Sequence, residues 1–220
     1  MSITKISNFG NPHIGLFARA SERMAVADLS ASPKFLLALQ QLGVPVVSAT
    51  FGGSGLAGIF SAMNSNGIMV PPSCSREEIS ELRRLGLNVA SVPSQFSAAG
   101  NNIAANDFGA VANPEMTQAE AKRVSDCLGV EVVRRRVAGY VTAGSCVLAT
   151  NKGFAAHNRT GEEELKELQE ILRVPGQNCT VNGGVAFVPI GAIANSKGCL
   201  AGEASTGFEA GRVAGALGLV

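Results

Sequence analysis

The chain has 220 residues, 46% of them hydrophobic and 16% charged, and 18 Lys and Arg oppose 17 Asp and Glu for a formal net charge of +1. This composition is typical of a globular protein that buries a sizeable core, and its neutrality argues against a protein that coats nucleic acid by neutralising phosphates. No apolar run reaches the ~18 residues that a membrane span needs, so we expect neither DNA nor a membrane as a partner.

The N-terminal residues 1–8 contain no apolar run typical of a secretory signal. The five cysteines form no C-x-x-C pair, and no G-x-x-x-x-G-K-[ST] loop occurs. We therefore expect no metal site, no disulfide framework, no nucleotide and no other cofactor, in a reducing, cytoplasmic environment.

The first predicted elements are a strand over residues 3–9, a second strand over 14–18, and a turn at Ser21-Glu22-Arg23-Met24. This turn lacks a glycine, so we expect a loose hairpin. Ser32 followed by Pro33 then predicts the start of an amphipathic helix that ends near Leu42, and an apolar strand follows over residues 44–51.

The same series recurs four more times along the chain. Its marker is a leucine, a glycine or arginine, and an aliphatic residue, at intervals of 43, 43, 44 and 45 residues: Leu42-Gly43-Val44, Leu85-Gly86-Leu87, Leu128-Gly129-Val130, Leu172-Arg173-Val174 and Leu217-Gly218-Leu219. Upstream of each later marker stand a hydroxyl residue and a glutamate spaced for a capping box: Ser75 and Glu78, Thr117 and Glu120, Thr160 and Glu163, Thr206 and Glu209.

A hairpin precedes each of these helices, with its turn marked by Gly at residues 64–67, 106–109, 151–153 and 195–198. Each unit is therefore predicted to run strand, hairpin, strand, helix, strand. The fifth unit stops at Val220 without its last strand, whereas residues 3–9 supply a spare one. We predict a single α/β ring domain over residues 1–220, in which the N-terminal strand closes the fifth repeat. The repeats span approximately 10–53, 54–97, 98–141, 142–186, and 187–220 plus 1–9.

The chain also resembles a known family along its whole length. The residues that carry the resemblance lie at 10–18, 52–54, 64–71, 99–101 with 106–107, 144–145 with 150–153 and His157, 180–184, 195–198 and 216–220. They are similar to those of translation initiation factor 6, the ribosome anti-association factor family. The resemblance implies a pentein fold, a monomer without enzymatic activity, and the archaeal form that ends without a regulatory tail.

The resemblance further implies the function. Members of the family bind the large ribosomal subunit, chiefly through a ribosomal protein on its intersubunit face, with limited rRNA contact near the sarcin–ricin loop. The bound factor keeps the small subunit from joining, in translation initiation and in large-subunit maturation. Glycine-marked loops at one end of the ring are the expected contact sites, and Asn101 falls in the loop that matches a contact loop of the family.

The candidate ribosome-binding residues lie in or beside these loops: Asn11, Gly15, Ser54, Gly58, Ile59, Gly100, Asn101, Gly144, Ser145 and Gly191. For the glycines we favour turn geometry alone as the explanation, and the polar side chains can equally well cap their own loop backbone. The run 134–136, with Arg123 and the pair 83–84, offers positive charge for rRNA phosphate. At this net charge we favour a solvated edge for these arginines, with Arg135 on the opposite face of its strand from its neighbours.

A rival interpretation comes from the same ring architecture, which also includes amidino-group hydrolases and transferases with a Cys nucleophile and a His. Cys199 and His157 occur in a compatible order. However, no paired carboxylates that would hold a guanidinium are apparent near either residue, and Cys199 falls where a buried strand residue is expected. We favour a binding protein without catalysis.

Overall fold

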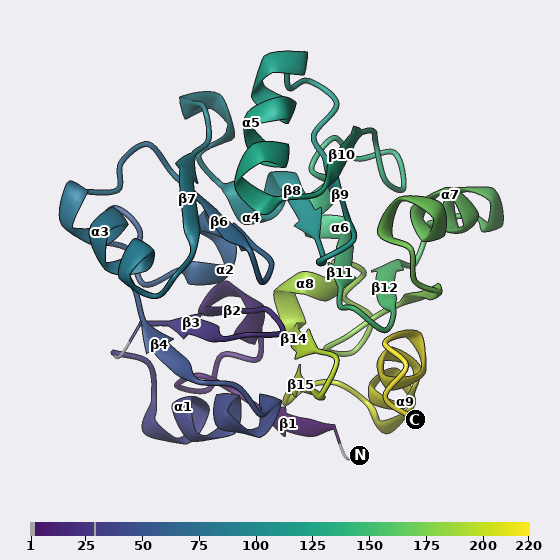
Figure 1. Ribbon diagram of the computed structural model, residues 1–220. Coiled ribbons are helices and arrows are strands. Elements are labelled where there is room, and N and C mark those ends of the chain that lie inside the picture. The colour runs from purple at the N-terminus through teal and green to yellow at the C-terminus, as the bar shows by residue number, and fades with distance from the viewer. Residues whose placement is uncertain (1–2, 29) are drawn as a thin grey trace.

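A computed structural model describes residues 3–28 and 30–220; residues 1 and 2 of the predicted fifth repeat and residue 29 of the first lie outside it. Five three-stranded sheets surround a common centre, with long helices on the outside (Figure 1). The sheets are β2 (Ala18–Ala20), β3 (Ala25–Ala27) and β4 (Val46–Ser48); β5 (Ala62–Met63), β6 (Gly67–Val70) and β7 (Asn88–Ser91); β8 (Ile103–Ala105), β9 (Gly109–Ala112) and β10 (Glu131–Arg134); β11 (Val147–Ala149), β12 (Phe154–His157) and β13 (Gly176–Cys179); and β14 (Ala192–Asn195), β15 (Gly198–Gly202) and β1 (Thr4–Ile6).

Every sheet has the same order, an antiparallel hairpin followed by a parallel third strand. In the fifth sheet the third strand is β1, whose Thr4 and Ile6 pair with Leu200 and Gly202 of β15. The N-terminal strand thus completes the fifth sheet, as the sequence predicts. Its pairing covers an edge of β15 that would otherwise be open.

The outer helices are α1 (Pro33–Leu39), continued by η2 (Gln40–Leu42), and α3 (Arg76–Arg84), α5 (Gln118–Leu128), α7 (Glu162–Leu172) and α9 (Gly207–Ala216). Capping boxes form at Ser75, Thr117 and Thr206, and the Ser32 side chain accepts from Phe35 N, all as predicted.

The predicted cap at Thr160 is wrong. Helix α7 begins one residue later, with Gly161 at the N-cap, and the buried Thr160 hydroxyl has no hydrogen-bond partner among the described residues. The glutamate at the third helical position is then Glu164, which accepts from Ala138 N rather than from the cap. Three glutamates in the first turn of α7 offset the missing cap through the helix dipole.

Strands are shorter than predicted because a one-turn helix precedes each hairpin. These helices are η1 (Ile14–Leu16), α2 (Ala57–Phe60), α4 (Ala99–Asn102), α6 (Ala143–Cys146) and α8 (Val188–Gly191), and a further turn, η3 (Ser94–Phe96), precedes α4. The predicted strand over residues 14–18 is therefore mostly η1. The first hairpin is also not loose: Ser21 N donates to Met24 O at 2.9 Å, the same closure that Asn64 and Gly67 make at 3.1 Å.

Buried asparagines in the hairpins join neighbouring sheets. Asn106 donates through Nδ2 to Thr150 O of the next hairpin and to Leu172 O at the end of the next long helix. Asn64 in the second hairpin and Asn195 in the fifth make the same pair of bonds, Asn64 to Asn106 O and Leu128 O, and Asn195 to Ser21 O and Leu42 O. Ser21 and Thr150 occupy this position in the other two hairpins. Both side chains are too short for the interunit pair and bond within their own turns.

The core is divided among the sheets and their helices, and the marker leucines belong to it. Leu42, Leu128, Leu172 and Leu217 are wholly buried, whereas Leu85 is only partly buried. No helix in residues 3–28 and 30–220 combines the length and apolar character needed to cross a membrane.

Candidate functional site

The ring has two faces of different chemistry. On one, which we call the hairpin face, the hairpin turns carry charged residues such as Glu22, Asp107 and Lys197. On the other, the turn face, the third strand of each sheet leads through a turn into a one-turn helix. The five one-turn helices contain no charged residue. The helices at the centre of the turn face are therefore uncharged.

The one-turn helices contact one another in a closed cycle, η1 to α2, α4, α6, α8 and back to η1, around the centre seen in Figure 1. Glycine permits this approach. A Cβ on Gly58 would collide with Gly15 O, one on Gly100 with Gly58 O, and one on Gly144 with Gly100 O. All four glycines are buried and none has a left-handed φ, so close backbone packing, not turn geometry, requires them.

Gly191 does not share this position. It is the last residue of α8, whereas Gly58, Gly100 and Gly144 are second in their helices. Pro189 is second in α8, and its carbonyl lies where a Cβ on Gly15 would fall. The residue of α8 that corresponds to Gly15, Gly58, Gly100 and Gly144 is therefore Pro189, two residues before the predicted Gly191.

The third residue of each one-turn helix is partly exposed on the turn face: Leu16, Ile59, Asn101, Ser145 and Ile190. The cycle brings the predicted residues Ile59, Asn101 and Ser145 into one ring of positions. Ser145 Oγ donates to Asn101 O at 3.3 Å. The Asn101 amide has no hydrogen bond within the described residues, so its donors and acceptor are available to a partner.

The other two predicted side chains cap their own loops. Asn11 Oδ1 accepts from His13 N at 2.9 Å, and Ser54 Oγ accepts from Leu56 N at 3.3 Å. Both remain partly exposed at the outer edge of the turn face. Capping of their own loop backbone is the alternative that the sequence left open for these side chains. The two hydrogen bonds fix the loops that precede η1 and α2.

Carboxylates from the outer helices hold two of the turns in place. Glu209 accepts from Thr206 N, from Gly183 N and Gly184 N, and from Thr180 Oγ1, at 2.7–3.0 Å. Burial alone would raise the pKa of this carboxyl, but the four hydrogen bonds outweigh burial and lower the pKa to about 2. Glu78 holds the turn at Gly52 and Gly53 in the same way, and its pKa is also lowered.

An aromatic cluster that the sequence did not indicate combines residues of the third, fourth and fifth repeats. The rings of Tyr140, His157 and Phe187 have centroids 4.9–5.2 Å apart. Tyr140, in the turn before α6, and Phe187, directly before α8, are partly exposed, whereas His157 is buried. With Ile59 and Ile190, they give the turn face an apolar character suited to a protein partner.

Arg19 is a second feature of the turn face that the sequence did not indicate. Its guanidinium donates to Gly58 O and Gly100 O, the same carbonyls that pack against the glycines. Burial lowers the pKa of Arg19 to about 10, so the side chain stays charged at neutral pH. The residues at its position in the other inner strands are Ala62, Ala104, Leu148 and Ile193. An alignment of the repeats is the signal that could have identified it.

The rival catalytic pair is not assembled. Cys199 is buried, its thiol donates to Leu200 O at 3.5 Å, and burial raises its pKa to about 12. His157 lies in the aromatic cluster, where its Nδ1 accepts from Arg159 N at 3.1 Å; burial lowers the pKa of this imidazole. A thiol in that state is a poor nucleophile, and the histidine makes no hydrogen bond with it in the described part of the chain.

The arginine run is bound to its own protein. Arg135 forms ion pairs with Glu164 and Glu167 of α7. Arg134 donates to Met116 O and Gln118 Oε1, in the opposite direction, as the strand alternation predicts. These bonds favour the solvated edge over contact with phosphate. Within the described residues, no group of three or more His, Cys, Asp or Glu side chains is placed to hold a metal ion.

Comparison with known proteins gives one consistent result. Residues 3–216 match the model of the eIF-6 family. A protein of Methanosphaerula palustris named Translation initiation factor 6 is 37% identical over 212 residues, which cover 96% of each chain. Proteins of the same name from Staphylothermus marinus and Pyrococcus abyssi are 33% and 34% identical, and cover 97% and 100% of this chain and 96% and 100% of their own.

Proposed function

The chain belongs to the eIF-6 family, whose relatives here are archaeal translation initiation factors, and we propose that it binds the large ribosomal subunit through its turn face and thereby keeps the small subunit from joining. The same binding would act in initiation and in large-subunit maturation. We also propose that residues 1–220 form one domain of the pentein type, divided into the five repeats given above.

The observation that carries the proposal is the turn face itself. It presents a cycle of one-turn helices without charged residues, partly exposed apolar side chains, and an Asn101 amide that is free to pair. Depletion of charge with exposed aromatic and aliphatic side chains is the character of the centre of a protein–protein interface. A ring of this size can present roughly 800 Å² to a partner, which is enough for a specific complex.

The surface charges favour a ribosomal protein over rRNA as the main contact. The chain carries almost no net charge, and Arg134 and Arg135 are engaged within the protein. A complex that rests on few phosphate contacts loses little affinity with salt, because few counterions are released on binding. We therefore expect binding to weaken only modestly between low and moderate salt, with rRNA contact limited to the edge of the interface.

The test is sucrose-gradient sedimentation of purified archaeal subunits with and without the protein. We expect the protein to travel with the large subunit and, in excess, to reduce the fraction of joined subunits. Sedimentation with the small subunit, or unchanged joining at saturating protein, would contradict the proposal.

The face is tested by Asn101→Arg, which places a bulky charge among the one-turn helices. Its side chain makes no internal hydrogen bond among the described residues, so the fold should be unaffected while dissociation from the subunit speeds up at least tenfold. Gln40→Arg is the matched control, because Gln40 is an exposed amide near the hairpin-face end of an outer helix. Equal dissociation rates for the two variants would place the interface elsewhere.

A further inference from the structure

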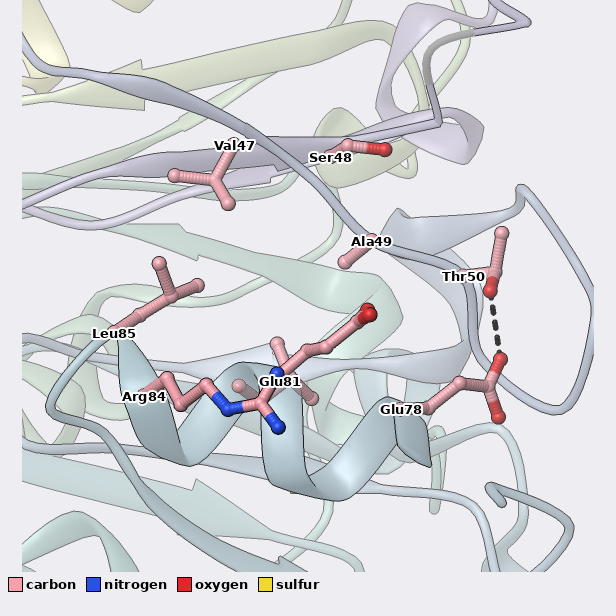
Figure 2. A pocket seen from close by; sticks show the side chains of 9 residues that line it. Val47, Ser48, Ala49, Thr50, Glu78, Glu81, Arg84 and Leu85 are labelled. Carbon is pink, nitrogen blue, oxygen red and sulfur yellow. Dashed lines mark hydrogen bonds between the residues drawn. The ribbon is translucent and has the colours of Figure 1, made fainter. Parts of the chain in front are cut away.

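A cleft of about 260 Å³ opens on the rim of the ring between β4 of the first unit and α3 of the second. Figure 2 shows Val47 and Ala49 directed from the strand toward the helix, and Leu85 directed back toward the strand. The hydrogen bond from Thr50 Oγ1 to Glu78, 2.7 Å long, closes one end. Glu81 and Arg84 lie along the helix at the mouth.

The repeats themselves show that this junction is unusual. The leucine that ends each outer helix is wholly buried in four units, and only Leu85, at this cleft, is partly exposed. The carbonyls of Leu42, Leu128 and Leu172 each accept from an asparagine of the neighbouring hairpin. Ser21 stands in the corresponding position for Leu85, as Thr150 does for the fully buried Leu217, and bonds within its own turn. The end of α3 therefore lacks this tie to the first unit.

The free edge of β4 runs along the same cleft. Pro45 O accepts from Ala25 N, and Ala49 N donates to Ala27 O, so the odd-numbered residues bond inward to β3. In a parallel pair the backbone groups of alternate residues point to opposite sides, and those of Val46 and Ser48 consequently point outward. Neither residue makes an outward backbone hydrogen bond in the described part of the chain.

We propose that this cleft docks an extended peptide segment of a partner protein. The segment adds a strand to β4 through the outward groups of Val46 and Ser48, and one large apolar side chain fills the space between Val47 and Leu85. An unpaired strand edge selects an extended backbone, which neither a helix nor a compact small molecule satisfies. The charges at the mouth select a basic residue of the peptide beside Glu81 and an acidic one beside Arg84.

The rim position makes this site independent of the proposed ribosome contact. The cleft is lined by β4 and α3, and none of its lining residues belongs to a one-turn helix. A protein that covers the turn face leaves the rim open, so a partner bound here can accompany the factor on the large subunit. Failure of one binding event therefore does not decide the other.

The experiment is selection from a random library of linear nine-residue peptides displayed on mRNA, with the full chain as bait. We expect enriched peptides that combine a central aromatic residue or leucine with β-branched neighbours and a basic residue. Two pairs of variants then test the geometry. Ser48→Pro removes the outward N–H of an exposed edge residue, and Ser48→Ala keeps it. Leu85→Arg fills the cleft, and Leu37→Arg makes the same change on the exposed face of α1.

Enriched peptides should lose at least tenfold in affinity with Ser48→Pro and with Leu85→Arg, and less than twofold with Ser48→Ala and Leu37→Arg. Large-subunit binding should be the same for all four variants. Sensitivity to Leu85→Arg without sensitivity to Ser48→Pro would refute strand addition and leave a pocket for an apolar group. Peptides that bind all four variants equally, or an absence of enrichment, would overturn the site altogether.

Discussion

Replacing Asn106 by threonine separates the bonds between units from the bonds within a turn. In the third hairpin, Asn106 Nδ2 donates to Thr150 O at 3.0 Å and to Leu172 O at 2.8 Å, while its Oδ1 accepts from Phe108 N and Gly109 N. The fourth hairpin carries Thr150 in the same place, and its hydroxyl accepts from Lys152 N and Gly153 N only. Asn106→Thr therefore keeps the turn and removes the two interunit bonds.

The expected loss in the free energy of unfolding is about 2–3 kcal/mol, because two hydrogen bonds are lost and two buried carbonyls are left without donors. Asn106→Ala additionally leaves Phe108 N and Gly109 N without their acceptor, and should cost about 3–5 kcal/mol. The reverse change, Thr150→Asn, gives the fourth hairpin an amide that can reach the carbonyls of Asn195 and Leu217. It should raise stability by about 1 kcal/mol.

The assay is equilibrium unfolding in urea, with the midpoint and slope compared among the four proteins. The order of stability should be Thr150→Asn, wild type, Asn106→Thr and Asn106→Ala. A value for Asn106→Thr within about 0.5 kcal/mol of wild type would show that the interunit bonds contribute nothing net. Equal losses for the threonine and alanine variants would show instead that the hydrogen bonds from Phe108 N and Gly109 N to the side chain contribute no net stability.

Three further predictions concern single elements. Glu209→Gln should destabilise the protein at pH 7 by at most about 3 kcal/mol. Because the pKa of Glu209 in the folded state is lowered to about 2, the difference in stability between the variant and the wild type should disappear as the pH falls from about 4.5 toward 2. A difference that does not change with pH in urea titrations would contradict this. Deletion of residues 1–9 removes β1 from β15 and should cause unfolding or aggregation, so an unchanged melting temperature and solubility would refute closure by this strand. Arg19→Met leaves the carbonyls of Gly58 and Gly100 without their donor and should lower the free energy of unfolding by about 2 kcal/mol. Calorimetry should show a smaller loss for Arg19→Lys, which keeps the charge. Equal losses for the two variants would show that the charge does not contribute to stability.

Repeats, helix starts and turns could be predicted because their signals are local. A serine or threonine three residues before a glutamate specifies a helix start at Ser75, Thr117 and Thr206 from within one turn of chain. The error at Thr160 has the same origin. Gly161 and three successive glutamates allow the helix to start at either of two positions, and the bond from Ala138 N to Glu164 decides between them from another unit.

The one-turn helices could not be predicted, because four residues carry no helical periodicity. Ala99–Asn102 takes its conformation from packing against the corresponding helices of neighbouring units, and the sequence shows only the glycine that permits the contact. The sequence therefore assigned Gly58, Gly100 and Gly144 to loops, whereas the structure places them in one-turn helices. Asn101 is on the turn face as an available side chain, whereas Gly100 is buried beneath it.

The two faces of the ring differ in how their units are joined, and this difference decides which positions on each face can change. Asn64, Asn106 and Asn195 join units at the hairpin face with buried bonds that any charged or bulky replacement would break. The one-turn helices join units by backbone packing at glycine, which requires nothing of the next side chain along. Positions such as Asn101 are consequently free to change with a partner while the ring stays intact. Stability and binding should thus be separable by face: hairpin-face variants move the unfolding midpoint, and turn-face variants move the dissociation rate.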